Sequence, residues 1–590
     1  MTLKQMPGTN PQIVFDNVTY RYPRSNGNVL KEVLLAVGEK QFVGITGRTG
    51  AGKTTLLSLV NGLIPQFFEG DMSGQVTVEG KDTQQTDLIA MSTVVGMVFQ
   101  DAETQILATT VEKDVAFGPS NTGQSTEETR RNVHSAILQT GLTGFEKRSP
   151  TQLSGGEKQR VAIAGVLAMK PRILALDEPT SELDPEGSRQ LFAMLERLCR
   201  DERLTLLVVS HESDRLMKHA ERIVVIDDGR ICWDGSPRAL FSNVAACHQW
   251  GISVPIIPEL MWRLQQRGVV PAGPVPLTLE EAIPVITELH RTVSDPDHAW
   301  ISDANRCSHN EVLIEIQGLS HHYNGLRDAL QGITLQIARG EFVALIGKNG
   351  AGKTTLAKHL NGLLKPTDGK VTINSKDTRK HSIGELSRSV GYVFQNPDHQ
   401  IFCPSVREEV AFGLRTIGGL SETEIESRTI DALRTVGLEK VADRHPFTLG
   451  KGERQKLAVA SVLARAPEVL VIDEPTTGLD REGGQIMMEV IRKLHADGHT
   501  IIVITHDMQL AADYAERVIV MTEGRVMADG SPEEIFLQPE LLRRAALTMP
   551  PVAELSLALR ANGIEIPCVS INKFEERLLC RPSAGVNYAG

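Results

Sequence analysis

The chain has 590 residues, too many for a single hydrophobic core, and therefore predicts several compact units. Its hydrophobic share of 41% is ordinary for a globular protein, no apolar run is long enough for a membrane helix, and the first seven residues lack a signal-peptide core, so we expect a cytoplasmic protein. A net charge of −11 argues against a nucleic-acid partner, and seven scattered cysteines without a C-x-x-C pair predict no zinc site.

The first predicted elements are two strands and a glycine-rich loop. Residues 13–20 have a strand pattern, and the apolar run at residues 42–45 leads into Gly47-Arg48-Thr49-Gly50-Ala51-Gly52-Lys53-Thr54. This G-x-x-x-x-G-K-T pattern is typical of a loop whose backbone N–H groups surround phosphate, followed by a helix that directs its positive end at the same anion. We expect Lys53 at the terminal phosphates of ATP, Thr54 at Mg²⁺, and Thr55 beside them.

Several side chains around this loop are candidates for the same site. Tyr22 precedes the loop and could stack on adenine. Gln100 lies where the pattern becomes predominantly helical, between residues 104 and 167, which predicts a helical subdomain inserted into the α/β core. A side-chain amide at that junction could contact Mg²⁺ and respond to movement of the subdomain.

Two further strands end in polar residues. Residues 173–176 are apolar and are followed by Asp177 and Glu178, and residues 208–209 lead to Ser210 and His211. Parallel strands of an α/β sheet bind ligands at their carboxyl ends. We therefore assign Asp177 to Mg²⁺, Glu178 to activation of the attacking water, and His211 to the terminal phosphate and that water.

The second half of the chain repeats this pattern almost at constant spacing. Lys353 lies 300 residues after Lys53, and His506 lies 295 residues after His211. The repeated candidates are Tyr323, Gly347-Lys348-Asn349-Gly350-Ala351-Gly352-Lys353-Thr354, Thr355, Gln395, Asp473, Glu474 and His506, with Thr354, Gln395 and Asp473 at the metal. A duplicated domain explains this spacing, and the expected fold class is α/β, with a phosphate-loop core and a helical insertion in each copy.

The segment Leu153-Ser154-Gly155-Gly156-Glu157 makes the pattern specific, because together with the other motifs it resembles the signature sequence of ATP-binding cassette (ABC) proteins. The resemblance implies that two cassettes pack head to tail and enclose two ATP molecules, each between one phosphate loop and the other cassette's signature. Ser154, Gly155 and Gly156 would open a helix whose N–H groups face the terminal phosphate.

The second signature departs from the first. Gly450-Lys451-Gly452 stands where the first copy has Ser154-Gly155-Gly156, so a hydroxyl is lost and a long side chain is gained. The two composite sites are therefore expected to be unequal: the second phosphate loop would meet the intact signature, and the first loop the altered one. The alternative, that Lys451 supplies a compensating charge to phosphate, stays open.

Short motifs suggest a narrower family. Residues 101–107 and 396–402 follow the two glutamines, and residues 111–118 and 406–413 follow these; together with Asn61-Gly62-Leu63-Ile64-Pro65 they resemble the ATPase components of energy-coupling factor (ECF) importers. The resemblance implies two membrane partners, a coupling protein and a small protein that captures a vitamin or metal ion. A groove near Ile106, Leu107 and Phe117, and near Ile401, Phe402 and Phe412 in the other half, would receive helices of the coupling protein.

The expected organisation is a tandem of cassettes with small appendages, so that one chain supplies both cassettes: a first cassette at residues 1–245, an appendage and linker at 246–310, a second cassette at 311–541 and a second appendage at 542–590. Two other functions remain open. One is the ATPase of an importer that depends on a soluble sugar- or peptide-binding protein. The other is a tandem ABC protein acting on ribosomes or DNA, although the connector lacks the long charged arm typical of that class.

Overall fold

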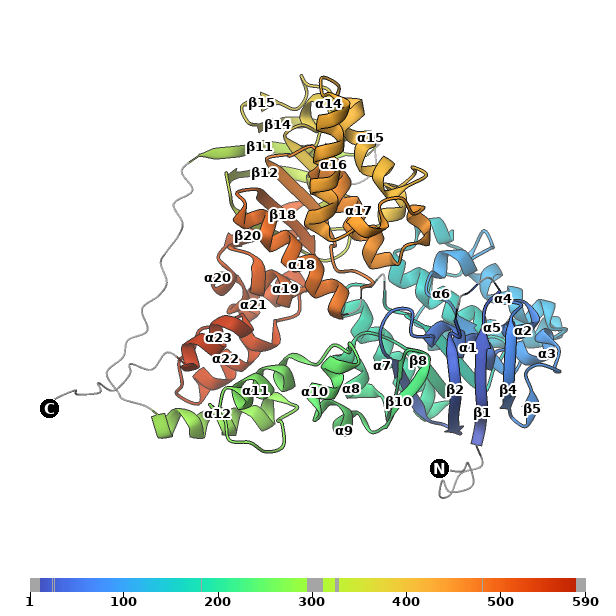
Figure 1. Ribbon diagram of the computed structural model, residues 1–590. Coiled ribbons are helices and arrows are strands. Elements are labelled where there is room, and N and C mark those ends of the chain that lie inside the picture. Colours follow the sequence, from blue (N-terminus) through green and yellow to red (C-terminus); the bar gives the residue numbers. More distant parts are fainter. Residues whose placement is uncertain are drawn as a thin grey trace. The chain divides into compact units, whose positions relative to one another are not determined.

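The computed structural model describes residues 11–579 except 24, 26, 182, 294–310, 324–327 and 480. The chain forms two compact units, Met1–Glu259 and Leu260–Gly590. Each unit contains one copy of the repeated strand and helix pattern, which confirms the predicted tandem of α/β cassettes (Figure 1). The last part of the predicted linker, residues 294–310, lies outside the described residues.

The first unit contains two sheets. The smaller sheet is antiparallel with the order β2-β1-β4-β5, and the larger has the order β10-β9-β3-β8-β7-β6. All neighbours in the larger sheet pair in parallel except β10, which runs antiparallel to β9. The strands are β1 (Pro11–Arg21), β2 (Leu30–Gly38), β3 (Phe42–Thr46), β4 (Asp71–Val78), β5 (Lys81–Asp82), β6 (Val95–Val98), β7 (Ile173–Asp177), β8 (Thr205–Val209), β9 (Arg222–Asp227) and β10 (Arg230–Gly235).

Helices of the first unit separate into those that follow the sheet strands and an inserted group. The inserted group is α4 (Val111–Asn121), α5 (Thr126–Gln139) and α6 (Gly155–Leu167), which pack on one another between β6 and β7 as predicted. The others are α1 (Lys53–Val60), α2 (Leu63–Gln66), α3 (Leu88–Ser92), α7 (Pro185–Asp201), α8 (Ser213–His219), α9 (Pro237–Phe241) and α10 (Val244–Gln249). The helix α11 (Ile256–Gln266) crosses the division between the units.

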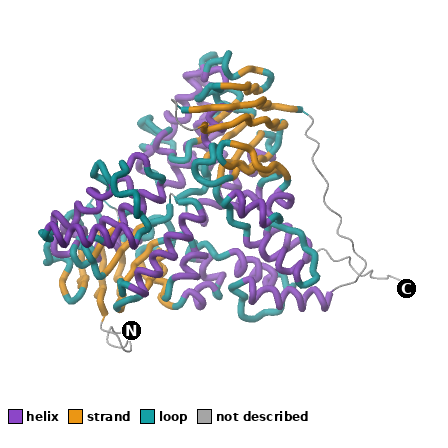
Figure 2. Tube along the Cα trace, turned by 180° about the vertical axis from the view of Figure 1, so that it is seen from behind, coloured by secondary structure: helices purple, strands orange, loops and turns teal. Residues whose placement is uncertain are grey.

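The second unit repeats both sheets, with the orders β12-β11-β14-β15 and β16-β17-β18-β13-β19-β20. Figure 2 shows the strands of this unit gathered together with helices beside them. The strands are β11 (Val312–His322), β12 (Asp328–Ala338), β13 (Phe342–Ile346), β14 (Asp368–Ile373), β15 (Lys376–Asp377), β16 (Val390–Val393), β17 (Val469–Asp473), β18 (Thr500–Thr505), β19 (Arg517–Thr522) and β20 (Arg525–Gly530).

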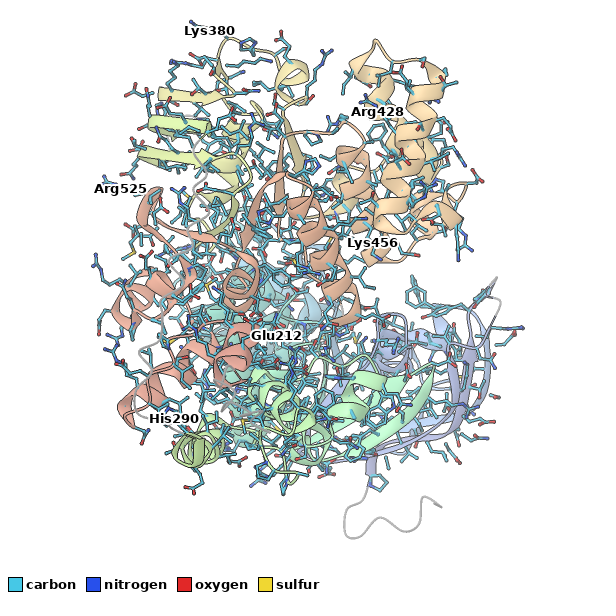
Figure 3. The ribbon with its side chains drawn as sticks, turned by 60° about the vertical axis from the view of Figure 1, so that its left-hand side comes forward. Glu212, His290, Lys380, Arg428, Lys456 and Arg525 are labelled. Carbon is cyan, nitrogen blue, oxygen red and sulfur yellow. The ribbon has the colours of Figure 1, made fainter. Side chains whose placement is uncertain are left out.

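The helices of the second unit follow the same plan. Lys380 marks the small sheet in Figure 3, and Arg428 marks the helical insertion of α15 (Val406–Ile417), α16 (Glu422–Val436) and α17 (Lys451–Leu463). The others are α12 (Leu279–Val293), α13 (Lys353–Leu360), α14 (Ile383–Leu386), α18 (Arg481–Ala496), α19 (Met508–Tyr514), α20 (Pro532–Phe536), α21 (Pro539–Ala545), α22 (Pro551–Ala561) and α23 (Ile571–Leu579). None of the helices in the described part of the chain is long and apolar enough to cross a membrane.

The central strands explain why polar residues collect at one edge of each large sheet. Every residue of β3, β7 and β8 is buried, because a parallel sheet is covered on both faces. In the parallel registers, Ile45 pairs with Val209 and Leu176 pairs with Val208, so the carboxyl ends of the three strands are adjacent. The phosphate loop, the acidic pair and His211 follow these ends directly.

The segment that follows the first cassette is divided between the units. Residues 260–293, predicted as part of the connector, group with the second unit, where α12 packs against α22. In the same unit, the buried Glu575 of α23 forms ion pairs with Arg263 of α11 (3.9 Å) and with Arg267, which directly follows that helix (3.0 Å). Within this unit, the C-terminal appendage therefore packs against helices that precede the second cassette in sequence.

The C-terminal appendage also holds α19, the helix that follows His506. Gln509 Nε2 donates to the carbonyl of Val569 (3.2 Å), and the N–H of Ile571 donates to the carboxylate of Asp513 (3.2 Å). Burial raises the pKa of Asp513 from 3.8 to about 6. Between pH 3.8 and about 6 the unfolded chain has lost the proton of this carboxyl, whereas the folded protein still keeps it. The contribution of Asp513 to the free energy of unfolding therefore falls as the pH rises through this range.

Replacing Asp513 by asparagine should remove this pH dependence while retaining an oxygen acceptor for Ile571. At about pH 8, we expect the free energy of unfolding of Asp513→Asn to exceed that of the wild type by up to about 3 kcal/mol. Near pH 4 the two free energies should be equal. The measurement is urea unfolding at both pH values, with the exposed Asp497→Asn as the matched control. An Asp513→Asn effect of equal size at both pH values would contradict the prediction.

Candidate functional site

In the first unit, the loop between β3 and α1 has a backbone that only glycine accommodates. Gly47 has φ of +142°, and a Cβ atom there would lie 2.0 Å from the carbonyl oxygen of Ile226. The ammonium of Lys53 is buried and donates to the carbonyls of Gly47 and Arg48, both at 2.9 Å. The loop thus has the closed shape predicted for a phosphate site, with the lysine folded over it.

The side chain of Arg48 does not point into this loop. Its Nη2 donates to the carbonyl of Gln249 (2.9 Å), and its Nε lies 3.7 Å from Asp227. A Cβ atom on Gly251 would lie only 2.7 Å from the side chain of Arg48, so the arginine fills the space beside this glycine. Arg48 can therefore serve the loop through its backbone, while its side chain connects the loop to the end of the first unit.

In each unit, two of the three predicted metal residues, the threonine and the aspartate, meet at the neighbouring strand end. Thr54 Oγ1 donates to Oδ2 of Asp177 at 2.6 Å, and in the second unit Thr354 donates to Oδ2 of Asp473 at 3.1 Å. Burial raises the pKa of both aspartates, opposed in each by the threonine hydrogen bond. Hydroxyl and carboxylate oxygens are the ligands that Mg²⁺ prefers.

Glu178 and His211 are brought together in the first unit. Nε2 of His211 lies 3.2 Å from Oε1 of Glu178, although this buried oxygen accepts no well-directed hydrogen bond from the described residues. Burial raises the pKa of Glu178 to about 7, against the opposing charge of Lys53. Its carboxyl therefore binds a proton more firmly than an ordinary glutamate, as suits a group that accepts a proton near neutral pH.

The second unit repeats this pair with a different histidine geometry. Nδ1 of His506 lies 2.8 Å from Oε2 of Glu474. Burial alone would lower the pKa of His506, but its hydrogen bond and charge interaction with Glu474 raise the pKa above its ordinary value. Lys353 folds back onto the carbonyls of Gly347 (2.6 Å) and Lys348 (3.1 Å), as Lys53 does in the first unit.

The tyrosines and glutamines have different relations to the loops. The hydroxyl of Tyr22 lies 3.2 Å from Thr55 Oγ1, and that of Tyr323 lies 3.4 Å from Thr355 Oγ1, so both tyrosines lie beside the first turn of a phosphate-loop helix. Gln100 and Gln395 are exposed just after β6 and β16. Within the described residues, no hydrogen bond joins either amide to the aspartate at its predicted metal site.

The two signatures begin helices in different ways. Ser154 caps α6 in a reciprocal box, in which Glu157 Oε2 accepts from the backbone (2.7 Å) and hydroxyl (2.9 Å) of the serine. Gly450 begins α17 with nearly the same backbone angles, and only its N–H reaches Glu453 (3.0 Å). A Cβ atom on Gly478 would lie 2.2 Å from the ammonium of Lys451, so the lysine occupies the space left by that glycine.

The structure also shows one contact that the sequence analysis missed. The hydroxyl of Tyr392, on β16, donates to Oδ2 of Asp473 at 2.9 Å. Burial, together with the charge of Asp473, raises the pKa of Tyr392 above its ordinary value, so the phenol remains a hydrogen-bond donor. The sequence carried one signal, a tyrosine within an otherwise apolar strand where the first copy has Met97.

These geometries fit a nucleotide with Mg²⁺. The closed glycine loop, the buried lysine and the threonine–aspartate pair recur in both units. Described histidine, cysteine and carboxylate side chains form no group of three or more that could hold a metal without further ligands. The threonine and aspartate oxygens suit an ion that takes its remaining ligands from phosphate and water, where Mg²⁺ neutralises charge on the phosphates.

Comparison with known proteins supports this reading. The ABC transporter family model matches residues 30–181 and 330–477. The chain is 40% identical over 562 residues to a protein of Caldanaerobacter subterraneus subsp. tengcongensis named as an ABC transporter ATP-binding protein, covering 95% of this chain and 98% of that protein. A similarly named protein of Methanosarcina acetivorans is 41% identical over 95% of this chain and 92% of its own length.

Among solved structures, cbiO1 from Clostridium perfringens, described as part of the ABC transporter complex cbiONQ, is 38% identical and covers 42% of this chain and 98% of its own, with a TM-score of 0.37. The family assignment rests on three findings: the family model matches twice, the relatives match nearly the whole chain, and each cassette has a phosphate-loop site. The chain therefore belongs to the ABC transporter family, as an ATP-binding component that carries two cassettes in one polypeptide and hydrolyses ATP with Mg²⁺.

Proposed function

We propose that this chain powers an ECF-type importer for a vitamin or a metal ion, at the cytoplasmic face of the membrane. Its partners are a transmembrane coupling protein and a small membrane protein that captures the substrate. The paired motifs after Gln100 and Gln395 and the appendage after each cassette support this proposal. The proposal includes the division of the chain into two cassettes, each followed by an appendage, with boundaries at residues 245, 310 and 541.

The observation that carries the proposal is a pair of matched apolar surfaces. In each cassette, two large apolar side chains are exposed just after the glutamine, one before the first inserted helix and one on it. They are Leu107 (69% exposed) and Phe117 (51%) in the first cassette, and Phe402 (64%) and Phe412 (47%) in the second. We call these four residues the docking residues. The rings of Phe402 and Phe412 contact each other edge to face, with centroids 4.9 Å apart.

The neighbouring isoleucines, which were predicted to line the same groove, are less exposed than the docking residues. Ile401 is 4% exposed and packs in the core of the second cassette, and Ile106 is only partly exposed. Contiguous exposed apolar side chains mark interaction sites in many proteins, and here they recur at equivalent places in both cassettes. Helices of a membrane partner would bury them.

The proposed mechanism uses two composite ATP sites in the ATP-bound form. Site one combines the second phosphate loop and Asp473, Glu474 and His506 with the intact signature at Ser154-Gly155-Gly156. Site two combines the first phosphate loop and Asp177, Glu178 and His211 with the altered signature at Gly450-Lys451-Gly452. We infer that site one performs most of the turnover.

Each residue has a distinct part in this proposal. The lysine and loop N–H groups bind the phosphates, while threonine, aspartate and glutamine orient the metal. The glutamate accepts the proton of the attacking water, and the histidine holds the glutamate and the terminal phosphate in place. The tyrosines stack on adenine. The signature serine and glycines donate hydrogen bonds to the phosphate from the opposite side.

The experiment is to purify the tagged chain from membranes of its own host in mild detergent and identify what accompanies it. Two small, very hydrophobic proteins without a soluble binding protein would support the proposal. A soluble substrate-binding protein would instead favour a binding-protein-dependent importer. Recovery from the cytosol with ribosomes or DNA would overturn the transport function and leave the ATPase chemistry intact.

Substituting the docking residues and repeating the same purification tests whether they bind the membrane partners. We expect Leu107→Asp combined with Phe402→Asp to reduce recovery of the membrane partners at least ~10-fold, because a buried charge is expensive in an apolar contact. Binding of ATP should be unchanged. The matched control is Leu138→Asp, since Leu138 is 64% exposed on α5 at a different place. Equal recovery with the double variant and the control would remove the docking residues from the proposal.

A further inference from the structure

Asp473, the predicted metal residue at the end of β17, accepts a hydrogen bond from a buried donor. Tyr392 is 6% exposed, and its hydroxyl donates to Oδ2 of Asp473 at 2.9 Å. Thr354 donates to the same oxygen at 3.1 Å. Two donors from β16 and α13 therefore converge on one carboxylate oxygen at the end of β17.

The first cassette has a methionine at this place. Tyr392 pairs with Val471 in the parallel register of β16 and β17, and Met97 pairs with Ala175 in that of β6 and β7. Both partners lie two residues before the aspartate, so the two positions are structurally equivalent. A thioether cannot donate a hydrogen bond. The threonine contact is present in both cassettes, whereas the tyrosine contact is present in the second alone.

We propose that Tyr392 is a positioning residue for Mg²⁺ at the second phosphate loop, where it fixes the orientation of the Asp473 carboxylate. The inference rests on the proposed metal role of Asp473. If the hydroxyl of Thr354 contacted bound Mg²⁺, it would no longer hold the carboxylate, and the phenol of Tyr392 would still keep one oxygen in place. Met97 leaves Asp177 without this restraint in the first cassette.

The expected size of the effect of Tyr392 on Mg²⁺ binding can be taken from similar contacts in other proteins. Groups that orient metal ligands typically contribute 10- to 100-fold to metal affinity or activity. If Asp473 held Mg²⁺, the orientation of its carboxylate would decide how well its oxygens served the metal, and Tyr392 fixes one of these oxygens. We expect Tyr392 to matter for the Mg²⁺-dependent part of ATP binding and not for the nucleotide itself.

The test measures binding of a fluorescent ATP analogue by the full chain, with Mg²⁺ and with a chelator. Lys53→Ala disables the first phosphate loop, so the second loop is observed alone. The quantity of interest is the gain in affinity that Mg²⁺ provides. We expect Tyr392→Phe to reduce this gain ~10-fold while affinity in the chelator stays unchanged. Tyr392→Met, which reproduces the residue of the first cassette, should behave in the same way and serves as the second variant.

Two outcomes would overturn the inference: an unchanged Mg²⁺ gain in both variants, or an equal loss of affinity with and without Mg²⁺, which indicates packing alone. Asp473→Asn separates the inference from the function on which it rests. If Asp473→Asn removes the gain and the tyrosine variants do not, only the role of Tyr392 fails. If Asp473→Asn also keeps the full gain, the metal assignment of Asp473 fails.

Discussion

Replacing Glu474 by glutamine should reduce steady-state ATP hydrolysis ~10²-fold, whereas Glu178→Gln should change it less than about twofold. Both substitutions remove a candidate base, a group that typically contributes 10²–10⁴-fold. Their effects should differ because the proposed mechanism places Glu474 in site one, with the intact signature, and Glu178 in site two, with Gly450-Lys451-Gly452. Loss of oriented donors at site two is expected to slow that site ~10²-fold already, by analogy with oxyanion-hole deletions.

The two glutamate–histidine pairs also differ in geometry. Glu474 has His506 at 2.8 Å, while His211 lies 3.2 Å from an oxygen of Glu178 that accepts no hydrogen bond from the described residues. The measurement is phosphate release by each single variant and by the double variant, which sets the baseline. Binding of ATP to both variants serves as the control, because glutamine preserves the shape of the site. Equal losses in the two single variants would contradict unequal sites.

Much of the fold and the local chemistry could be predicted because they depend on short stretches of backbone. The loop at residues 47–54 requires glycine at positive φ, and the apolar run before Asp177 requires a buried parallel strand. Each motif specifies its own conformation. The nearly constant offset between the copies then places the same elements in the second half without further information.

Contacts between distant side chains could not be predicted in this way. The hydrogen bond from Arg48 to the carbonyl of Gln249 and the one from Tyr392 to Asp473 join residues far apart in sequence. Burial of Ile401 beside the exposed Phe402 depends on which face of the segment meets the helical core. Such contacts follow from tertiary packing, which a local pattern does not encode.

Exchange of the two signatures gives the second large effect. In the Glu474→Gln background, where site two supplies the remaining turnover, Gly450→Ser with Lys451→Gly should raise ATP hydrolysis ~10²-fold. The serine fits, because a Cβ atom on Gly450 meets nothing closer than Glu453 Oε2 at 3.8 Å. The backbone of Gly450 already has the angles of a helix N-cap.

The reciprocal change is the matched control. In the Glu178→Gln background, Ser154→Gly with Gly155→Lys should lower ATP hydrolysis by a similar factor, because it removes the hydroxyl and adds a long side chain at the helix start. Each double substitution gives its signature the charge that the natural signature of the other cassette has. A change in one direction only would indicate that something other than the signature separates the sites.

The single substitutions distinguish the two possible roles of Lys451. If the lysine obstructs the phosphate side of α17, Lys451→Gly alone should raise site-two turnover, since it empties the space beside Gly478 that the ammonium now fills. If the lysine compensates for the lost serine by contributing charge to phosphate, the same substitution should lower turnover. The sign of this change, measured in the Glu474→Gln background, decides between obstruction and compensation, and Gly450→Ser alone measures the contribution of the hydroxyl.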